Sequence, residues 1–295
     1  MLTGGASSTT LRVEVRTAAG PRRLIFRCAS AREGFALEID KATEARAQAA
    51  AHAHGVPTAE VCFVLAPEDE LGEGYAMQLV EGEASPRRFL GEEGIRARLA
   101  EQAGEALARI HQVPMDALPP LPHEAPAAQL LRLRVAYDSF AQPSPVFEVA
   151  FRWLAENLPA PRPAALVHGD FRTGNLLVGL DGIRAVLDWE LCHIGDPIED
   201  LGWCCVAAWR FGRLGDRVGG FGSVDALRRS YLAAGGADFT DAELTYWETY
   251  GTLRWGVICL YQAFAHLRGA IPSIERAAIG RRVSEVELDL LRLLS

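Results

Sequence analysis

The chain has 295 residues, of which 49% are hydrophobic and 23% charged, a composition typical of a globular protein with a large core. The formal charge of −8 argues against nucleic acid as a partner and is compatible with a cationic substrate. No segment approaches the roughly 18 consecutive apolar residues that a membrane helix needs. The first residues also lack the basic and apolar segments of a secretory signal. We therefore expect a cytoplasmic protein without membrane association, whose six cysteines are reduced because no CxxC or Cys/His spacing joins them.

The N-terminal part predicts a small sheet with one helix. Runs of apolar and β-branched residues predict four strands, at residues 11–15, 23–28, 61–65 and 75–80. A polar segment of helical character, residues 37–51, lies between the second and the third strand. The Gly- and Ser-rich segment 2–10 precedes the first strand. Such a segment is either a disordered terminus or a loop that folds over phosphate groups with its backbone N–H groups.

A change of composition after Gly82 marks the start of a mainly helical part. Apolar residues at spacings of three and four predict an amphipathic helix over residues 91–113. A proline-rich loop at 114–126 follows. Two further helices, at 127–140 and 145–157, either cap a substrate site or belong to the core.

The C-terminal part again predicts helices, at residues 241–267 and 283–294. Its aromatic side chains either belong to the core or line a substrate pocket: Trp247, Tyr250, Trp255 and Tyr261.

Residues 164–188 predict a hairpin with polar side chains at its loop ends. The expected order is strand 164–167, polar loop, strand 176–178, Asp-Gly turn and strand 183–187. Asp170 and Asn175 lie in the polar loop, and Asp188 follows the last strand. Phosphoryl transfer from ATP needs a carboxylate for the proton of the acceptor hydroxyl and hard oxygen ligands for Mg²⁺. Asp170 is therefore the candidate base, and Asn175 and Asp188 are candidate Mg²⁺ ligands, in a spacing typical of kinase catalytic and metal-binding loops.

Four neighbours of these residues are candidates for supporting roles. His168 is expected to hydrogen-bond the backbone and shape the loop, not to act as the base. Arg172 either contacts a phosphate or the substrate, or lies exposed on the surface. Glu190 is a candidate substrate-binding residue because it follows Asp188 by two positions. Asp196 precedes a predicted helix and is a candidate structural N-cap.

Three stretches resemble the aminoglycoside phosphotransferase and choline kinase superfamily of small-molecule kinases. They are HGDFRTGN at 168–175, VLDWE at 186–190 and GDPIEDLGW at 195–203. The longer run DWELCHIGDPIEDLGW, at 188–203, is most similar to the phosphotransferase domains associated with acyl-CoA dehydrogenases. The resemblance extends over nearly the whole chain and implies a bilobal, protein kinase-like α+β fold. A small antiparallel-sheet lobe over residues 1–81 would bind nucleotide, and a larger, mainly helical lobe over 82–295 would carry the catalytic and substrate-binding residues.

The resemblance also implies parts of the ATP site. Gly4, Gly5 and Ser7 match a phosphate-binding loop that such kinases carry between their first two strands, although the strand before it is missing here. Gln78 and Val80 match the hinge whose backbone binds adenine.

Arg27, at the end of the second predicted strand, is the candidate cation for the α- and β-phosphates. The only lysine, Lys41, lies in the helix-like segment and so in the wrong place for this role. Glu44 is the expected carboxylate partner of Arg27, unless it lies on a solvated helix face. Asp200 matches the aspartate that braces the catalytic loop backbone in this fold.

Together these features predict an ATP- and Mg²⁺-dependent kinase that phosphorylates a hydroxyl group of a small molecule. Three alternatives remain open. The acceptor is a hydroxylated metabolite, for example a hydroxyacyl compound, or it is an aminoglycoside antibiotic. In the third alternative the protein is a non-catalytic, pseudokinase-like nucleotide-binding protein. Nothing in the sequence identifies the acceptor or the oligomeric state.

Overall fold

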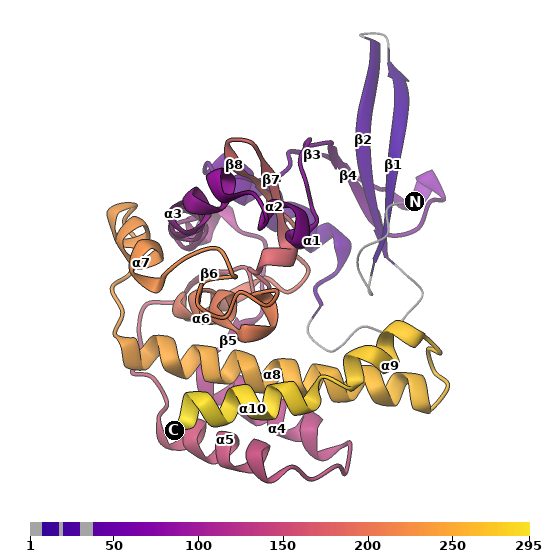
Figure 1. Cartoon of the computed structure of the whole chain (residues 1–295). Coiled ribbons are helices and arrows are strands. Elements are labelled where there is room, and N and C mark those ends of the chain that lie inside the picture. The colour runs from indigo at the N-terminus through magenta and orange to yellow at the C-terminus, as the bar shows by residue number, and fades with distance from the viewer. Residues whose placement is uncertain (1–7, 18–19, 30–37) are drawn as a thin grey trace.

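In the computed structural model, residues 8–17, 20–29 and 38–295 are described, and they form a small lobe built on a sheet and a larger helical lobe (Figure 1). The sheet is antiparallel, with the order β1-β2-β4-β3. Its strands are β1 Ser8–Thr17, β2 Gly20–Ala29, β3 Val61–Val64 and β4 Gly74–Gln78. All four expected strands are present. β1 is longer than the apolar run that predicted it because it pairs with β2 over its whole length, and the two form an arm that projects from the lobe (Figure 1).

Helix α1 Lys41–Ala53 packs against β2, β3 and β4. It begins at Lys41 because the carboxylate of Asp40 accepts a hydrogen bond of 2.8 Å from the backbone N–H of Thr43, which is an N-cap. The helix is therefore shorter at its start than the polar segment 37–51 predicted, and it brings its first turn to the end of β2.

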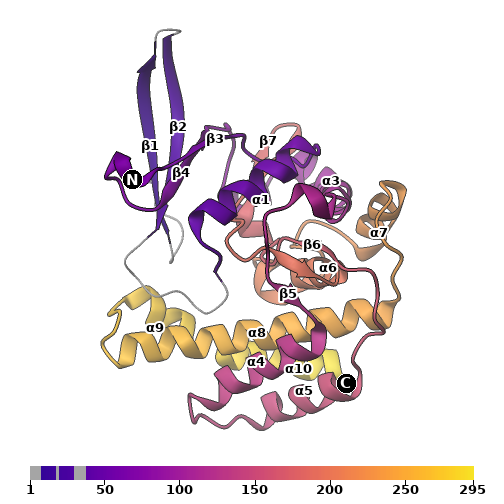
Figure 2. The ribbon, with the colours of Figure 1, turned by 180° about the vertical axis from the view of Figure 1, so that it is seen from behind.

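The larger lobe contains the other helices of the described chain. They are α2 Pro86–Phe89, α3 Glu93–His111, α4 Pro126–Asp138, α5 Pro145–Glu156, α6 Ile198–Cys205, α7 Val224–Ala233, α8 Asp241–Leu267, α9 Ile274–Gly280 and α10 Val283–Leu294. Helices α4, α5 and α10 lie along α8 at the end of the molecule that faces away from the sheet (Figure 2). None of the helices in the described ranges is long and apolar enough to cross a membrane.

Two small sheets carry the central polar residues. β7 Leu176–Gly179 and β8 Gly182–Val186 form the expected hairpin, whose turn ends at Gly182 with φ +109°. β6 Ala165–Val167 instead pairs with β9 His193–Gly195, which in turn pairs with β5 His123–Glu124. The sequence did not predict β5 and β9, because strands of two and three residues have no readable alternation.

The core fills the larger lobe. Trp247 and Tyr250 of α8 are buried in it, whereas Trp255 and Tyr261 are half-buried. Trp189 is fully buried next to the central hairpin.

Candidate active site

The loop that follows β6, residues 168–175, is held by the fully buried carboxylate of Asp200 on α6. This carboxylate accepts hydrogen bonds from the backbone N–H groups of His168, at 2.7 Å, and Gly169, at 2.9 Å. The ring of His111, at the end of α3, lies 3.2 Å from the same carboxylate. Burial opposes the negative charge, but these donors, led by His111, hold the pKa of Asp200 below its usual range. Asp200 therefore fixes the start of the loop as an anion.

Gly169 has a conformation that other residues rarely adopt. Its φ is +77°, and a side chain at this position would collide with the carbonyl oxygen of Leu191. The carbonyl of Gly169 itself accepts a hydrogen bond of 3.1 Å from Arg254 of α8. The backbone before Asp170 is thus fixed from both sides.

The carboxylate of Asp170 has three donors. Trp203 donates its indole N–H to Oδ1 at 2.8 Å, Arg172 donates from Nε at 3.0 Å, and the amide of Asn175 donates to Oδ2 at 2.6 Å. The guanidinium of Arg172 also stacks over the ring of Trp209, 4.9 Å from its centroid. Arg172 is therefore neither fully exposed nor unpaired in this structure.

His168 is completely buried, and burial lowers the pKa of its ring. Its Nδ1 accepts a hydrogen bond of 3.2 Å from the backbone N–H of Asp170. The imidazole thus supports the loop from inside the core.

Asn175 and Asp188 are joined through the backbone of the hairpin. The carbonyl of Asn175 accepts a hydrogen bond of 2.8 Å from the N–H of Leu187, the residue before Asp188. The Asn175 amide nitrogen donates to the backbone and the carboxylate of Asp170, which fixes the orientation of the amide. Asp188 has φ +71°, an uncommon conformation for a residue with a side chain and one that is found at functional sites.

Arg27 lies at the centre of a buried ion cluster, which we call the cleft cluster: Arg27, Lys41, Glu44, Asp188 and Glu190. Its Nε lies 2.6 Å from Glu44 Oε1, its Nη2 lies 2.8 Å from Glu190 Oε2, and Nη2 also pairs with Asp188. Burial works against the charge of Arg27, but Asp188 and Glu44 raise its pKa above the ordinary value. The expected partner Glu44 is therefore buried with Arg27 and not on a solvated face.

Lys41 also belongs to this cluster. Its Nζ lies 2.7 Å from Glu44 Oε2 and 3.3 Å from Glu190 Oε2. Lys41 was predicted only to be in the wrong place for the phosphate cation, and its place in this cluster, at the first residue of α1, was not predicted. The spacing of three residues between Lys41 and Glu44 was the signal that could have revealed it.

Known proteins share the sequence features of this site. The model of the phosphotransferase enzyme family (APH) matches residues 2–247, which is well over half of the chain. The chain belongs to that family. The resemblance of the three sequence motifs is therefore confirmed.

The relatives of this phosphotransferase include acyl-CoA dehydrogenase family member 11 of Gallus gallus. It is 33% identical over 179 residues, which are 57% of this chain and 23% of the relative. Acyl-CoA dehydrogenase family member 10 of Mus musculus is 43% identical over 65 residues, which are 21% of this chain and 6% of the relative. The chain thus spans less than a quarter of the length of these relatives.

Solved structures with the same fold include a candidate aminoglycoside phosphotransferase from Ralstonia eutropha JMP134. It has a TM-score of 0.72 at 21% identity, over 98% of this chain and 93% of that one. A choline/ethanolamine kinase family protein from Mesorhizobium loti has a TM-score of 0.64 at 20% identity, over 99% and 86% of the two chains. The fold is the expected bilobal, kinase-like one, and the family is one of phosphotransferase enzymes.

The connection between the lobes of the phosphotransferase runs through residues 78–83. The backbone N–H of Gln78 donates to Glu60 at 2.9 Å, and its side chain donates to the Glu60 carboxylate at 2.5 Å. Val80 is half-buried, and two residues past Glu81 the backbone of Glu83 pairs with Val178 of β7 at 2.7 and 3.0 Å. The predicted phosphate-loop residues Gly4, Gly5 and Ser7, and the expected missing strand, lie outside the described residues.

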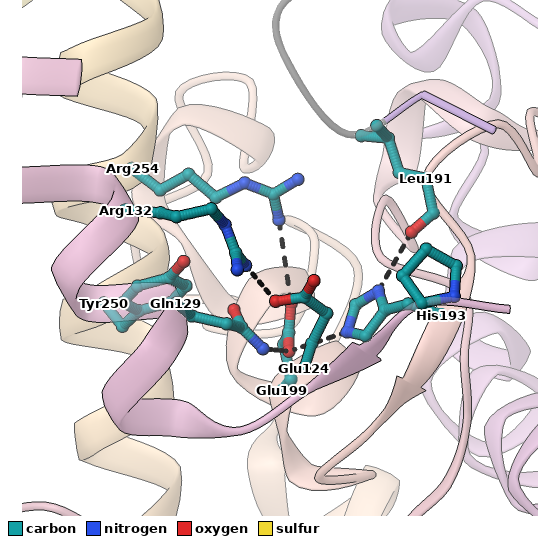
Figure 3. Close-up of a pocket in the computed structure, with 9 residues that line it drawn as sticks. Glu124, Gln129, Arg132, Leu191, His193, Glu199, Tyr250 and Arg254 are labelled. Carbon is teal, nitrogen blue, oxygen red and sulfur yellow. Dashed lines mark hydrogen bonds and ion pairs between the residues drawn. The ribbon is translucent and has the colours of Figure 1, made fainter. Parts of the chain in front are cut away.

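A second polar cluster, which we call the joint cluster, lies where α4 and α8 meet β5, β9 and α6 (Figure 3). Its charged members are Glu124, Arg132, His193, Glu199 and Arg254. Glu124 pairs with Arg132, and Glu199 lies 3.2 Å from His193 and 3.8 Å from Arg254. Through Arg254 this cluster reaches the carbonyl of Gly169.

The remaining predicted residue, Asp196, lies before α6. The helix begins at Ile198 with Pro197 as its capping residue, and the Asp196 carboxylate accepts a hydrogen bond of 2.9 Å from the N–H of Ile198. Sequence reasoning missed Trp203 and Arg254, whose contacts with the loop join residues 33 and 85 positions apart.

Proposed function

We propose that this phosphotransferase transfers the terminal phosphate of ATP, in a Mg²⁺-dependent reaction, to a hydroxyl group of a small metabolite. The observation that carries the proposal is the convergence of Asp170, Asn175 and Asp188: the side-chain amide of Asn175 donates to the Asp170 carboxylate, and the backbone carbonyl of Asn175 accepts from the N–H of Leu187, the residue before Asp188. Two similar structures support ATP as the donor. Spectinomycin phosphotransferase APH(9)-Ia is in complex with ADP and spectinomycin, and aminoglycoside phosphotransferase APH(4)-Ia is in complex with AMP-PNP and hygromycin B.

Asp170 accepts the proton of the acceptor hydroxyl in this proposal. Trp203 and Asn175 hold its two oxygens, so that the carboxylate is oriented before the substrate arrives. Arg172 occupies Oδ1 in this structure and would leave it for the transferred phosphate when the acceptor binds.

Asn175 and Asp188 are the proposed Mg²⁺ ligands. Their chemistry fits the ion, because Mg²⁺ takes oxygen ligands from one or two protein groups and the rest from phosphates and water. The Asn175 nitrogen is already used toward Asp170, which leaves its oxygen for a metal, and Asp188 already faces a cation, Arg27. A bound Mg²⁺ would neutralise charge on the phosphates.

The nucleotide would lie along the cleft between the lobes. Arg27 would bind the α- and β-phosphates, with Glu44 holding its guanidinium, and the backbone around Gln78 and Val80 would bind adenine. The phosphate-loop role of Gly4, Gly5 and Ser7 and the lobe boundary between residues 81 and 82 remain part of this proposal.

The first acceptor class is a hydroxyacyl compound, because the relatives of 30% identity and above are acyl-CoA dehydrogenase family members. Aminoglycosides are the second class, favoured by the formal charge of −8. The carboxylate of Glu190 is engaged by Arg27 and Lys41, so its predicted contact with the acceptor would require a rearrangement of the cleft cluster.

The test is Mg²⁺-dependent release of ADP in the presence of hydroxyacyl-CoA compounds, choline, ethanolamine, homoserine and aminoglycosides. Asp170→Ala should lower kcat by about 10²- to 10⁴-fold, the usual contribution of a general base, with ADP affinity retained. Asp181→Ala is the matched control, because Asp181 lies exposed in the turn of the β7–β8 hairpin. ADP binding without turnover on any acceptor would contradict the proposal and favour a non-catalytic nucleotide-binding protein.

A further inference from the structure

Lys41 is the only lysine among the 295 residues, and it is 5% exposed. Burying an ammonium group is costly unless carboxylates compensate for the lost hydration. Two carboxylates do so here, Glu44 at 2.7 Å and Glu190 at 3.3 Å, and they come from different lobes. Lys41 therefore joins the start of α1 to the segment that follows Asp188.

Lys41 and Arg27 share the same two carboxylates. Arg27 contacts Glu44 Oε1 and Glu190 Oε2, while Lys41 contacts Glu44 Oε2 and Glu190 Oε2. Within the described ranges, Asp188 has an ion pair with Arg27 and none with Lys41. The two cations thus overlap on Glu44 and Glu190 and differ only at Asp188.

This overlap has a consequence for nucleotide binding. If Asp188 binds Mg²⁺ and Arg27 turns to the phosphates, Glu44 and Glu190 lose one of their cations. A buried carboxylate that loses its only cationic partner is strongly destabilised. Lys41 already lies within hydrogen-bond distance of both carboxylates and can hold them after Arg27 has moved.

We infer that Lys41 is a positioning residue: it holds Glu44 and Glu190 so that Arg27 becomes available to the phosphates of the nucleotide. This inference rests on the proposed function. In this inference Lys41 does not contact the nucleotide. Arg27 moves to the phosphates when the nucleotide binds, and Lys41 stays on Glu44 and Glu190.

A double-mutant cycle tests whether Lys41 acts through Arg27. Lys41→Met should weaken Mg-ADP binding, measured by calorimetry, by about tenfold, the size of ordinary coupling between linked sites. Arg27→Met should weaken binding more, and adding Lys41→Met to it should cause little further loss. Lys41→Arg should restore binding, because an arginine can hold both carboxylates. Arg46→Met is the matched control, because Arg46 is an exposed cation on the same helix.

The wild-type protein offers an independent readout, because isotope labelling of lysine yields one side-chain NMR signal. We expect the signal of the Lys41 ε position to move when Mg-ADP is added, since Arg27 leaves the shared carboxylates. An unmoved signal at saturating Mg-ADP would overturn the inference even if Lys41→Met does not fold. The inference would also be overturned if Lys41→Met bound Mg-ADP as tightly as the wild type. A full tenfold loss when Lys41→Met is added to Arg27→Met would overturn it too, because it would indicate that Lys41 contacts the nucleotide directly. If the wild type does not bind Mg-ADP, the proposed function fails as well, so the two failures are distinguishable.

Discussion

Two of the buried ion clusters in the described part of the chain, the cleft cluster and the joint cluster, differ in charge balance. Counted over the described residues alone, the cleft cluster sets three carboxylates, Glu44, Asp188 and Glu190, against the two cations Arg27 and Lys41. The joint cluster sets Glu124 and Glu199 against Arg132 and Arg254, with the ring of His193 beside Glu199, so it carries no excess of negative charge (Figure 3).

This difference in charge suggests different roles: ion binding for the cleft cluster and structural support for the joint cluster. A balanced cluster needs no further ion, and the joint cluster connects α4 and α8 to the sheet that precedes the Asp170 loop. The cleft cluster carries an excess negative charge in a place where charge is costly. The divalent cation proposed at Asp188 would offset that excess. Unbalanced buried charge alone does not mark a functional site, because Glu248 pairs with two arginines, Arg210 and Arg217, elsewhere in the larger lobe. In the cleft cluster the excess adds to the order of Asp170, Asn175 and Asp188 along the chain.

The largest effect should come from neutralising Asp188. Asp188→Asn should lower kcat/KM by at least about 10³-fold, because a bound metal supplies several kcal/mol of charge stabilisation. The free energy of unfolding should change by less than about 1 kcal/mol, since Arg27 keeps Glu44 and Glu190 and the excess charge disappears. Glu124→Gln in the joint cluster is the comparison and should leave activity intact. Steady-state kinetics measures the activity and urea unfolding measures the stability. An inactive Glu124→Gln would contradict the distinction between the cleft cluster and the joint cluster.

Asp200→Ala should have the largest effect on stability. The change leaves two buried backbone N–H groups and the ring of His111 without the carboxylate that they contact. We therefore expect a loss of about 3–5 kcal/mol in the free energy of unfolding. The lowered pKa of Asp200 means that its contribution is present above the ordinary carboxyl pKa and is lost as the pH falls through the lowered value. Urea unfolding between neutral and acidic pH measures this. An unchanged acid limb in the variant would contradict the assignment.

Gly169→Ala should cost more stability than Gly269→Ala. Both glycines have positive φ, +77° and +72°, so both substitutions introduce backbone strain of about 1 kcal/mol or more. Only at Gly169 does the new Cβ also collide with the Leu191 carbonyl, whereas Gly269 has open space around it. Thermal unfolding of the two variants should therefore separate the effect of the collision from that of the backbone strain. Equal losses of stability would mean that the loop around Gly169 can shift to avoid the collision.

The smallest effect concerns the pH dependence of the joint cluster. Burial disfavours the charged ring of His193, but Glu199 outweighs it and raises the pKa of His193 above the ordinary value. The resulting stability is fully present below the ordinary histidine pKa and is lost as the pH rises through the raised one. We expect the free energy of unfolding to decline over that range, and Glu199→Gln to flatten the decline. If the free energy of unfolding of Glu199→Gln declined with pH as steeply as that of the wild type, the decline would come from another titrating group.

The sequence predicted the parts of the site that chemistry and spacing define. Asp170, Asn175 and Asp188 could be proposed because kinases need oxygen ligands and a base in this order. In the structure Asn175 and Asp188 flank the β7–β8 hairpin, whereas Asp170 follows β6, which pairs with β9. The family, the bilobal fold and the main helices could be read from motifs and from apolar periodicity. These features are local in sequence.

The features that sequence reasoning missed depend on contacts between distant segments. Trp203 reaches Asp170 and Arg254 reaches Gly169 because α6 and α8 pack beside the loop, which no local pattern encodes. The place of Lys41 in the cleft cluster was not predicted, because Lys41 was considered only as a cation for the phosphates, and that cation was expected on a strand. The position of Lys41 three residues before Glu44 at a capped helix start was sufficient to bring it into the cluster.

The most direct test of the central claim is ³¹P NMR of the reaction mixture with Mg²⁺, ATP and each acceptor. We expect a new phosphomonoester signal for one acceptor class with the wild type, dependent on Mg²⁺ and absent with Asp170→Ala. A signal that persists in Asp170→Ala, or bound ATP that yields no phosphomonoester with any acceptor, would contradict the account.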